Sequence, residues 1–264
     1  MLTVLEKIIE FLQFEMTEPE MYGWYHILCL FVMLLTIVAL SFKKLDTKKL
    51  LLCFSIIMIV LEVYKQLSFS YSGGKWDYQW YAFPFQFCSV PMYVSFIAAL
   101  TKSKKLEEYL YAFLATYSLV AGISVMAYPE TVFIPEVLID VQTMVHHGLM
   151  VVIGFYMLYH KVVEYKLKTL FKGLAVFVVL VAIAVTVNTV TYHIGLDGGL
   201  EWFYISPYHT STLPVFNIIY DKVPYVVFLF LYVFAFTVGG AIPLGVAALI
   251  SKISAKKKAN RKKK

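Results

Sequence analysis

The amino-acid sequence predicts an all-α polytopic membrane protein, a bundle of about seven transmembrane helices. Of its 264 residues, 60% are hydrophobic and only 15% are charged, whereas an ordinary soluble domain carries about 25% charged residues. A membrane-spanning helix needs roughly 20 mainly apolar residues, and several stretches reach that length with few or no charges. The connections between these stretches alternate between basic and non-basic. Together these observations exclude a water-soluble globular domain.

The chain divides into three regions by composition. Residues 1–21 form an amphipathic N-terminal segment without a basic n-region, so we expect it to lie on the membrane surface and not to act as a cleavable signal peptide. Residues 22–250 carry the seven expected spans, at 22–42, 48–70, 84–101, 106–127, 139–160, 169–193 and 223–250. Residues 251–264 form a basic tail.

Basic residues indicate the orientation of the bundle. They gather in the first, third and fifth connections and in the tail: Lys43, Lys44, Lys48, Lys49, Lys102, Lys104, Lys105, Lys161, Lys166, Lys168, Lys172, Lys252, Lys256, Lys257, Lys258, Arg261, Lys262, Lys263 and Lys264. Lys and Arg favour the cytoplasmic side of a membrane, so the N-terminus is expected outside and the C-terminus in the cytoplasm. We interpret the net charge of +6 as a cytoplasmic rim that attracts anionic lipid headgroups, and not as a nucleic-acid-binding surface.

Polar side chains converge in the outer half of the expected bundle. A charged side chain costs several kcal/mol inside the bilayer and normally faces a partner in the bundle interior. Because successive spans run in opposite directions, the ends of even spans meet the beginnings of odd spans, which predicts one outer-facing cavity. Only one of the two adjacent histidines is expected to face it. The residues concerned are Glu62, Lys65, Gln66, Gln86, Cys88, Ser89, Asp140, Gln142, Thr143, His146, His147, Asn188, Thr191 and His193.

Cys88 is the candidate nucleophile in this cavity. Pro84 suits the first turn of a helix and Pro91 can kink the helix just after it, so Cys88 is expected near a helix N-terminus, which favours the thiolate. With a histidine base and amide or N–H donors for an oxyanion, the thiol can hold an acyl group as a thioester. The alternative reading is that Cys88 is a small packing residue and that the histidines only satisfy hydrogen bonds.

The same residues do not favour a metal site or a disulfide. Cys88, His146 and His147 lack the spaced ligand set that zinc needs, so neither a metal nor another cofactor is expected. Cys29, Cys53 and Cys88 all fall inside expected spans and give no disulfide framework.

Two motifs carry a resemblance to a known family. The segment Phe83-Pro84-Phe85-Gln86-Phe87-Cys88-Ser89, followed by Gln142-Thr143-Met144-Val145-His146-His147-Gly148, is similar to the YwaF-like bacterial membrane family. Glu62, Asn188 and Pro224-Tyr225 occur in the order that this family shows, and the similarity spans nearly the whole chain. The stretch Gly198-Gly199-Leu200-Glu201-Trp202 departs from it, because a Gly-Asn-Tyr sequence is expected there. The resemblance implies a bacterial plasma membrane location.

That family in turn resembles an animal multi-pass acyltransferase that places polyunsaturated chains on ether phospholipids through a cysteine and a histidine. The resemblance implies that Cys88 accepts the acyl group and that His147, directly before Gly148, is the base in preference to His146. Glu62, Gln86, Gln142 and Asn188 would orient the base or stabilise the oxyanion.

The leading hypothesis is therefore a cysteine-dependent transacylase or lipid hydrolase that acts from the outer leaflet on phospholipid or lysophospholipid. The alternatives are a small transporter or ligand-binding membrane protein with an outer-facing polar cavity, and a structural accessory subunit. A transporter would show pH- or potential-dependent uptake without an acyl adduct. The absence of an inverted repeat counts against a secondary transporter.

Overall fold

The computed structural model describes residues 3–129 and 132–261, so Glu130 and the tail residues Lys262, Lys263 and Lys264 lie outside the described residues. The helices in chain order are α1 (Val4–Leu12), α2 (Trp24–Ser41), α3 (Thr47–Ser70), α4 (Val90–Leu100), α5 (Lys104–Phe113), α6 (Leu119–Ala127), α7 (Val137–Tyr159), α8 (Leu167–His193), α9 (Phe216–Tyr220) and α10 (Tyr225–Arg261). A two-stranded antiparallel hairpin follows α3, with β1 at Tyr71–Ser72 and β2 at Lys75–Trp76. Short 3₁₀ turns lie at η1 (Trp80–Ala82), η3 (Leu196–Gly198) and η4 (Trp202–Tyr204).

Within the described residues, six helices are long and apolar enough to cross a membrane, which confirms the all-α polytopic class. The fourth expected span is one continuous 24-residue helix, in which a π-helical turn, η2 (Leu114–Ser118), joins α5 to α6. We refer to it as the α5–α6 helix. The last helix continues to Arg261, eleven residues beyond the expected end of its span at residue 250.

The third expected span, 84–101, is wrong as a full-length helix. Only the 11 residues of α4 are helical there, which corresponds to about 16 Å of a hydrocarbon core about 30 Å thick. The chain from Phe83 to Ser89 is turn and irregular structure. Pro91 does not kink a helix; it lies in the first turn of α4, where its missing N–H costs no intrahelical hydrogen bond.

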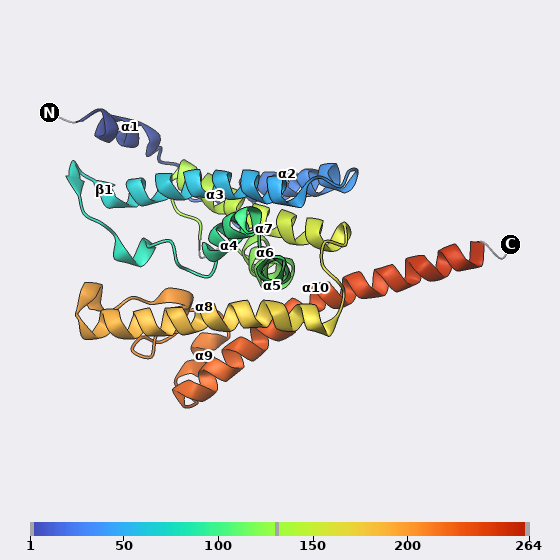
Figure 1. Cartoon of the computed structure of the whole chain (residues 1–264). Helices are drawn as coiled ribbons and strands as arrows, with labels where there is room; N and C mark the ends of the chain where they lie inside the picture. Colours follow the sequence, from blue (N-terminus) through green and yellow to red (C-terminus); the bar gives the residue numbers. More distant parts are fainter. Residues whose placement is uncertain (1–2, 130–131, 262–264) are drawn as a thin grey trace.

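The centre of the bundle is formed by α7 and the α5–α6 helix. In their most apolar windows 78% and 67% of the residues are buried, compared with 28% or less in the other four long helices, whose surfaces are therefore available to lipid. Figure 1 shows the α5–α6 helix nearly end-on while α3 and α8 run across the view, so it crosses them steeply. Glycines permit this close packing: a Cβ on Gly154 would lie 2.6 Å from the Cβ of Leu119.

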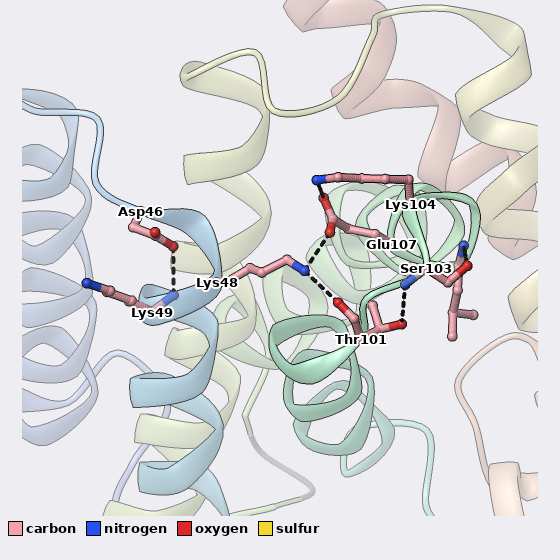
Figure 2. Close-up of polar contacts among 8 residues, drawn as sticks. Asp46, Lys48, Lys49, Thr101, Ser103, Lys104 and Glu107 are labelled. Carbon is pink, nitrogen blue, oxygen red and sulfur yellow. Dashed lines mark hydrogen bonds and ion pairs between the residues drawn. The ribbon is translucent and has the colours of Figure 1, made fainter.

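The first, third and fifth connections gather at one end of the bundle, as the alternation of basic residues predicts. Lys48 joins the start of α3 to the end of α4 and to the first turn of α5. Its Nζ donates to the Thr101 carbonyl at 2.6 Å and lies 2.8 Å from the Glu107 carboxylate. Figure 2 shows this network, with Lys104 on the other side of Glu107. Lys44 Nζ donates to the His160 carbonyl at 3.2 Å and so reaches the fifth connection. We call this the basic end.

The N-terminal helix α1 lies at the opposite end from the C-terminus (Figure 1). Thr3 and Glu6 form a capping box at its start, which satisfies two otherwise free donors. Its Ile9 is buried, while Val4 and Phe11 are 76% and 69% exposed. Gln13, just after the helix, donates through Nε2 to the Tyr71 carbonyl at 3.0 Å. The helix therefore rests on the end of α3 and the β hairpin with an apolar face outward.

Candidate functional site

A cavity of about 290 Å³ lies in the half of the bundle away from the basic end. Its walls come from the last turns of α3, the turn before α4, the first half of α7, and the connection after α8. It is lined by Lys65, Phe69, Tyr81, Ala82, Gln86, Cys88, Ser89, Val132, Ile134, Ile139, Gln142, Thr143, His146, His147 and Tyr204. The predicted candidates Cys88, His147, Gln86, Gln142 and His146 thus surround one space.

Cys88 lies in a tight turn at the start of α4. The Gln86 carbonyl accepts from Ser89 N at 2.9 Å and from Val90 N at 3.3 Å, and α4 begins at Val90. The half-buried thiol of Cys88 is thereby held just before a helix N-terminus, where partial positive charge favours an anion. Cys29 and Cys53, which are also free thiols, lie elsewhere on α2 and α3 and do not line this cavity.

Both adjacent histidines line the cavity, so the expectation that only one would face it is wrong. His147 Nδ1 lies 2.7 Å from the Thr143 carbonyl; because a carbonyl only accepts, Nδ1 must carry the proton. A neutral His147 ring therefore keeps its lone pair on Nε2, the arrangement of a general base. His146 Nε2 donates in the same way to the Cys88 carbonyl at 3.0 Å. By the same argument a neutral His146 ring keeps its lone pair on Nδ1, which has no hydrogen-bond partner among the described residues. The hydrogen bonds therefore leave a lone pair on each ring, and that of His146 in addition fixes the backbone of Cys88.

Glu62 does not line the cavity but holds residues that do. Its carboxylate is 3% exposed and lies 2.8 Å from Lys65 Nζ. It accepts from Gln66 Nε2 at 2.8 Å and from Gln142 Nε2 at 3.4 Å. Its lone pairs are therefore well used, as a buried carboxylate requires. The ion pair between Glu62 and Lys65 can be predicted from their i, i+3 spacing on one helix. The position of Lys65 in the cavity wall cannot be predicted from that spacing.

Gln86 and Asn188 hold the connection after α8 against the bundle. Asn188 accepts from Trp202 N at 2.8 Å and donates to the Trp202 carbonyl at 3.0 Å. Gln86 accepts from Phe203 N at 2.9 Å and donates to the Glu201 carbonyl at 3.2 Å. Asn188 does not reach the cavity, and each side-chain amide already has a backbone donor and a backbone acceptor. Asn188 is therefore a clamp for this connection, whereas Gln86 also lines the cavity and has one of its two amide N–H groups in the clamp.

Tyr204 is a cavity residue that the sequence did not identify. It follows the clamped residues Trp202 and Phe203, and both Phe203 and Tyr204 have positive φ, at 62° and 56°. These left-handed conformations turn the chain so that Phe203 is buried and Tyr204 lines the cavity. Burial raises the pKa of Tyr204 to about 12, so its hydroxyl stays protonated at neutral pH. The only sequence signal was the abundance of aromatic residues in this connection.

Lys65 is the cavity-lining residue with a full positive charge. Its ammonium has three protons and one carboxylate partner, Glu62. Within residues 3–129 and 132–261, no group of three His, Cys, Asp or Glu side chains is placed to hold a metal ion. The described cavity wall therefore offers a thiol, two imidazoles, an ammonium, two phenols, and the hydroxyls and amides of its Ser, Thr and Gln residues.

Fold and site together define a polytopic α-helical membrane protein with a partly open cavity in which polar side chains of several elements meet. The model of the TMEM164 family, a transmembrane family, matches residues 18–242. The chain therefore belongs to the TMEM164 family, and the matched range includes every residue of the cavity wall. Comparison with curated proteins and comparison with solved structures both find no match.

Proposed function

We propose that this protein is a membrane-embedded acyltransferase or lipid hydrolase that uses Cys88 to remove an acyl chain from a phospholipid of the outer leaflet. The observation that carries the proposal is that Cys88 and His147, with its free Nε2, line the same cavity. The resemblance of the Cys88 and His147 segments to the YwaF-like bacterial family, and through it to the animal ether-phospholipid acyltransferase, supports the same chemistry.

The first half-reaction forms a thioester. His147 Nε2 takes the thiol proton while Cys88 Sγ attacks the carbonyl carbon of the ester, which produces a tetrahedral oxyanion. When this intermediate collapses, the carbon–oxygen bond to the glycerol oxygen breaks and that oxygen takes the proton from His147. A lysophospholipid leaves and the acyl chain remains on Sγ.

The second half-reaction regenerates the thiol. The hydroxyl of a lysophospholipid, or water, loses its proton to His147 and attacks the thioester carbonyl. The carbon–sulfur bond breaks, and Sγ recovers the proton. The choice of acceptor decides between a transferase and a hydrolase, and no cofactor is needed for either.

Lys65 is the best-placed group to stabilise the oxyanion. Stabilisation of developing negative charge is often the largest catalytic term, and Lys65 is the cavity-lining residue with a full positive charge. Gln86 and Gln142 also line the cavity, and each has only one of its two amide N–H groups in a hydrogen bond, so either amide can add a second oxyanion donor. Glu62 keeps Lys65 at the cavity wall through the 2.8 Å ion pair. His146 acts as a positioning residue through its bond to the Cys88 carbonyl.

The test is a search for the thioester. The purified protein in nanodiscs is incubated with a phospholipid that carries a clickable acyl chain, and peptides are mapped for a hydroxylamine-labile adduct. An adduct on Cys88 that is absent in Cys88→Ala and retained in Cys53→Ala supports the proposal. His147→Ala should lower the rate at which the adduct forms. The thermal stability of Cys88→Ala is measured alongside: if it is unchanged, the loss of the adduct reflects the missing thiol and not a loss of packing.

One observation favours a second candidate function, a binding or transport protein. No hydrogen bond among the described residues joins the Cys88 thiol to either histidine, and the charged pair of Glu62 and Lys65 is suited to recognise a charged ligand. In that case no adduct forms with any lipid class, and ligand binding or uptake depends on pH or on membrane potential.

A further inference from the structure

The second half of α10 diverges from the bundle and leaves an open groove. With 37 residues, α10 is about 55 Å long, compared with a hydrocarbon core of about 30 Å. Figure 1 shows its C-terminal half extending away from the other helices beyond the basic end. A groove of about 650 Å³ lies between this part of α10, the helices α6 and α7, and the connection after α7. That volume is within the range of pockets that hold small molecules.

The groove changes character along its length. Its deeper part is apolar and is lined by Leu119, Ile123, Val151, Phe155, Val246 and Ala247. Toward the basic end the walls become polar and positively charged, with Ser251, Ser254 and Lys258 from α10 opposite Lys161. None of the described lining residues is acidic. An apolar slot that ends in two lysines and two hydroxyls has the chemistry of an acyl chain joined to an anionic headgroup.

Lys161 has a second feature that points to a ligand. It follows the C-terminus of α7 with φ of 54°, and Val162 N donates back to the Met157 carbonyl at 2.9 Å. This left-handed position after a helix is usually occupied by glycine, which adopts it without strain. A lysine there is conformationally unfavourable, and a strained residue of this kind is a reason to look for a role of its side chain.

Another cavity at the same end provides a contrast. It has a volume of about 440 Å³, and its charged lining residues are Lys104, Lys168 and Lys172 together with Glu107, Glu108 and Glu164. The equal numbers of acids and bases, and ion pairs such as the one between Lys172 and Glu108, leave little net charge to select an anion. The groove beside α10 differs because its positive charge is uncompensated and adjoins an apolar wall.

We propose that the groove between α10 and α7 is a binding site for one anionic phospholipid of the cytoplasmic leaflet. The phosphate lies between Lys161 and Lys258 and accepts from Ser254, while an acyl chain packs against Ala247 and the apolar wall. The site is separate from the Cys88 cavity and does not depend on catalysis there. By filling the space beside α10, the lipid holds the diverging half of this helix in place.

The experiment measures lipid retention by native mass spectrometry. The full-length protein is equilibrated with mixed micelles of phosphatidylglycerol and phosphatidylcholine with the same acyl chains. The wild-type protein should retain one phosphatidylglycerol in preference to phosphatidylcholine. The test variant combines Lys161→Gly, which suits the left-handed conformation, with Lys258→Gln, and retention should fall about tenfold or more.

The matched control removes the same charge from positions that do not line the groove, Lys256→Gln with Lys257→Gln, and should keep the wild-type preference. Ala247→Trp leaves both lysines in place but fills the apolar part, and should also reduce retention. Cys88→Ala should retain the lipid fully, which separates this site from the proposed function. Equal loss in the control pair, equal retention of phosphatidylcholine, or a lipid-free dimer joined through α10 would overturn the proposal.

Discussion

Substitution of Gly154 by alanine tests whether the contact between α7 and the α5–α6 helix determines the stability of the bundle. A Cβ at this position would lie 2.6 Å from the Leu119 Cβ and 3.0 Å from the Leu114 carbonyl oxygen. Ordinary carbon–carbon contacts are about 3.5–4.0 Å, so the two helices would have to separate by roughly 1 Å. Overpacking of this kind costs about 1–3 kcal/mol. We expect the upper half of that range, because the obstacles belong to the helix itself and not to a flexible side-chain end.

The assay is reversible unfolding in mixed micelles of increasing SDS content, followed by tryptophan fluorescence. The control is Gly245→Ala on α10, where no atom lies within 4 Å of the added Cβ and alanine is the better helix former. The control should therefore be as stable as the wild type or slightly more stable. If Gly154→Ala unfolds at the same SDS content as Gly245→Ala, the central helices are not packed as described and the reasoning fails.

Three further predictions concern single contacts. Asn188→Ala leaves the N–H and carbonyl of Trp202 without their partners, which should cost about 1–3 kcal/mol and increase proteolysis of the connection after α8. Glu107→Gln weakens the partly buried ion pair in Figure 2 and should destabilise the bundle by about 1 kcal/mol, whereas Lys104→Ala, at an exposed position, should have almost no effect in the same assay. Glu6 has a pKa below its usual 4.5 because of its hydrogen bonds to the first residue of the capping box, so the cap is stable above that pH and weakens as pH falls through the lowered pKa. The protection of α1 amides from hydrogen exchange, corrected for the intrinsic pH dependence of exchange, should therefore decrease in acid, and Glu6→Gln should remove this decrease.

Hydropathy predicted most of the helices because a long apolar run in a bilayer has almost no alternative to a helix. The bounds of the expected spans at 139–160 and 169–193 differ by no more than two residues from those of α7 at Val137–Tyr159 and α8 at Leu167–His193. The same property misled the prediction at 84–101, where Phe85 and Phe87 raise the hydropathy of a segment that is turn and irregular structure and not helix. Hydropathy also placed the end of α10 too early, because lysines interrupt a hydrophobic run without terminating the helix.

The grouping of Cys88, Gln142 and the two histidines was predictable because opposite directions of successive spans bring polar ends to one level. What could not be predicted is how many sides of a helix are covered. Since α7 is surrounded by other elements, adjacent positions such as His146 and His147 can both face protein. The role of Asn188 depends on a loop residue, Trp202, and no periodicity in the sequence indicates such a contact.

The short helix α4 and the cavity are two consequences of the same backbone irregularity. Non-helical chain at membrane depth is tolerated only where protein or trapped water satisfies its polar groups, and here side chains of α3 and α7 do so. Gln66 donates to the Ala82 carbonyl at 2.6 Å, and His146 donates to the Cys88 carbonyl at 3.0 Å. The polar residues that stabilise the irregular segment must therefore lie beside it, and Cys88, within that segment, lines the same cavity as His146. A structural requirement of the fold thus brings together the groups that the proposed chemistry would use: His146, which holds the irregular segment, is followed directly by His147, the proposed base.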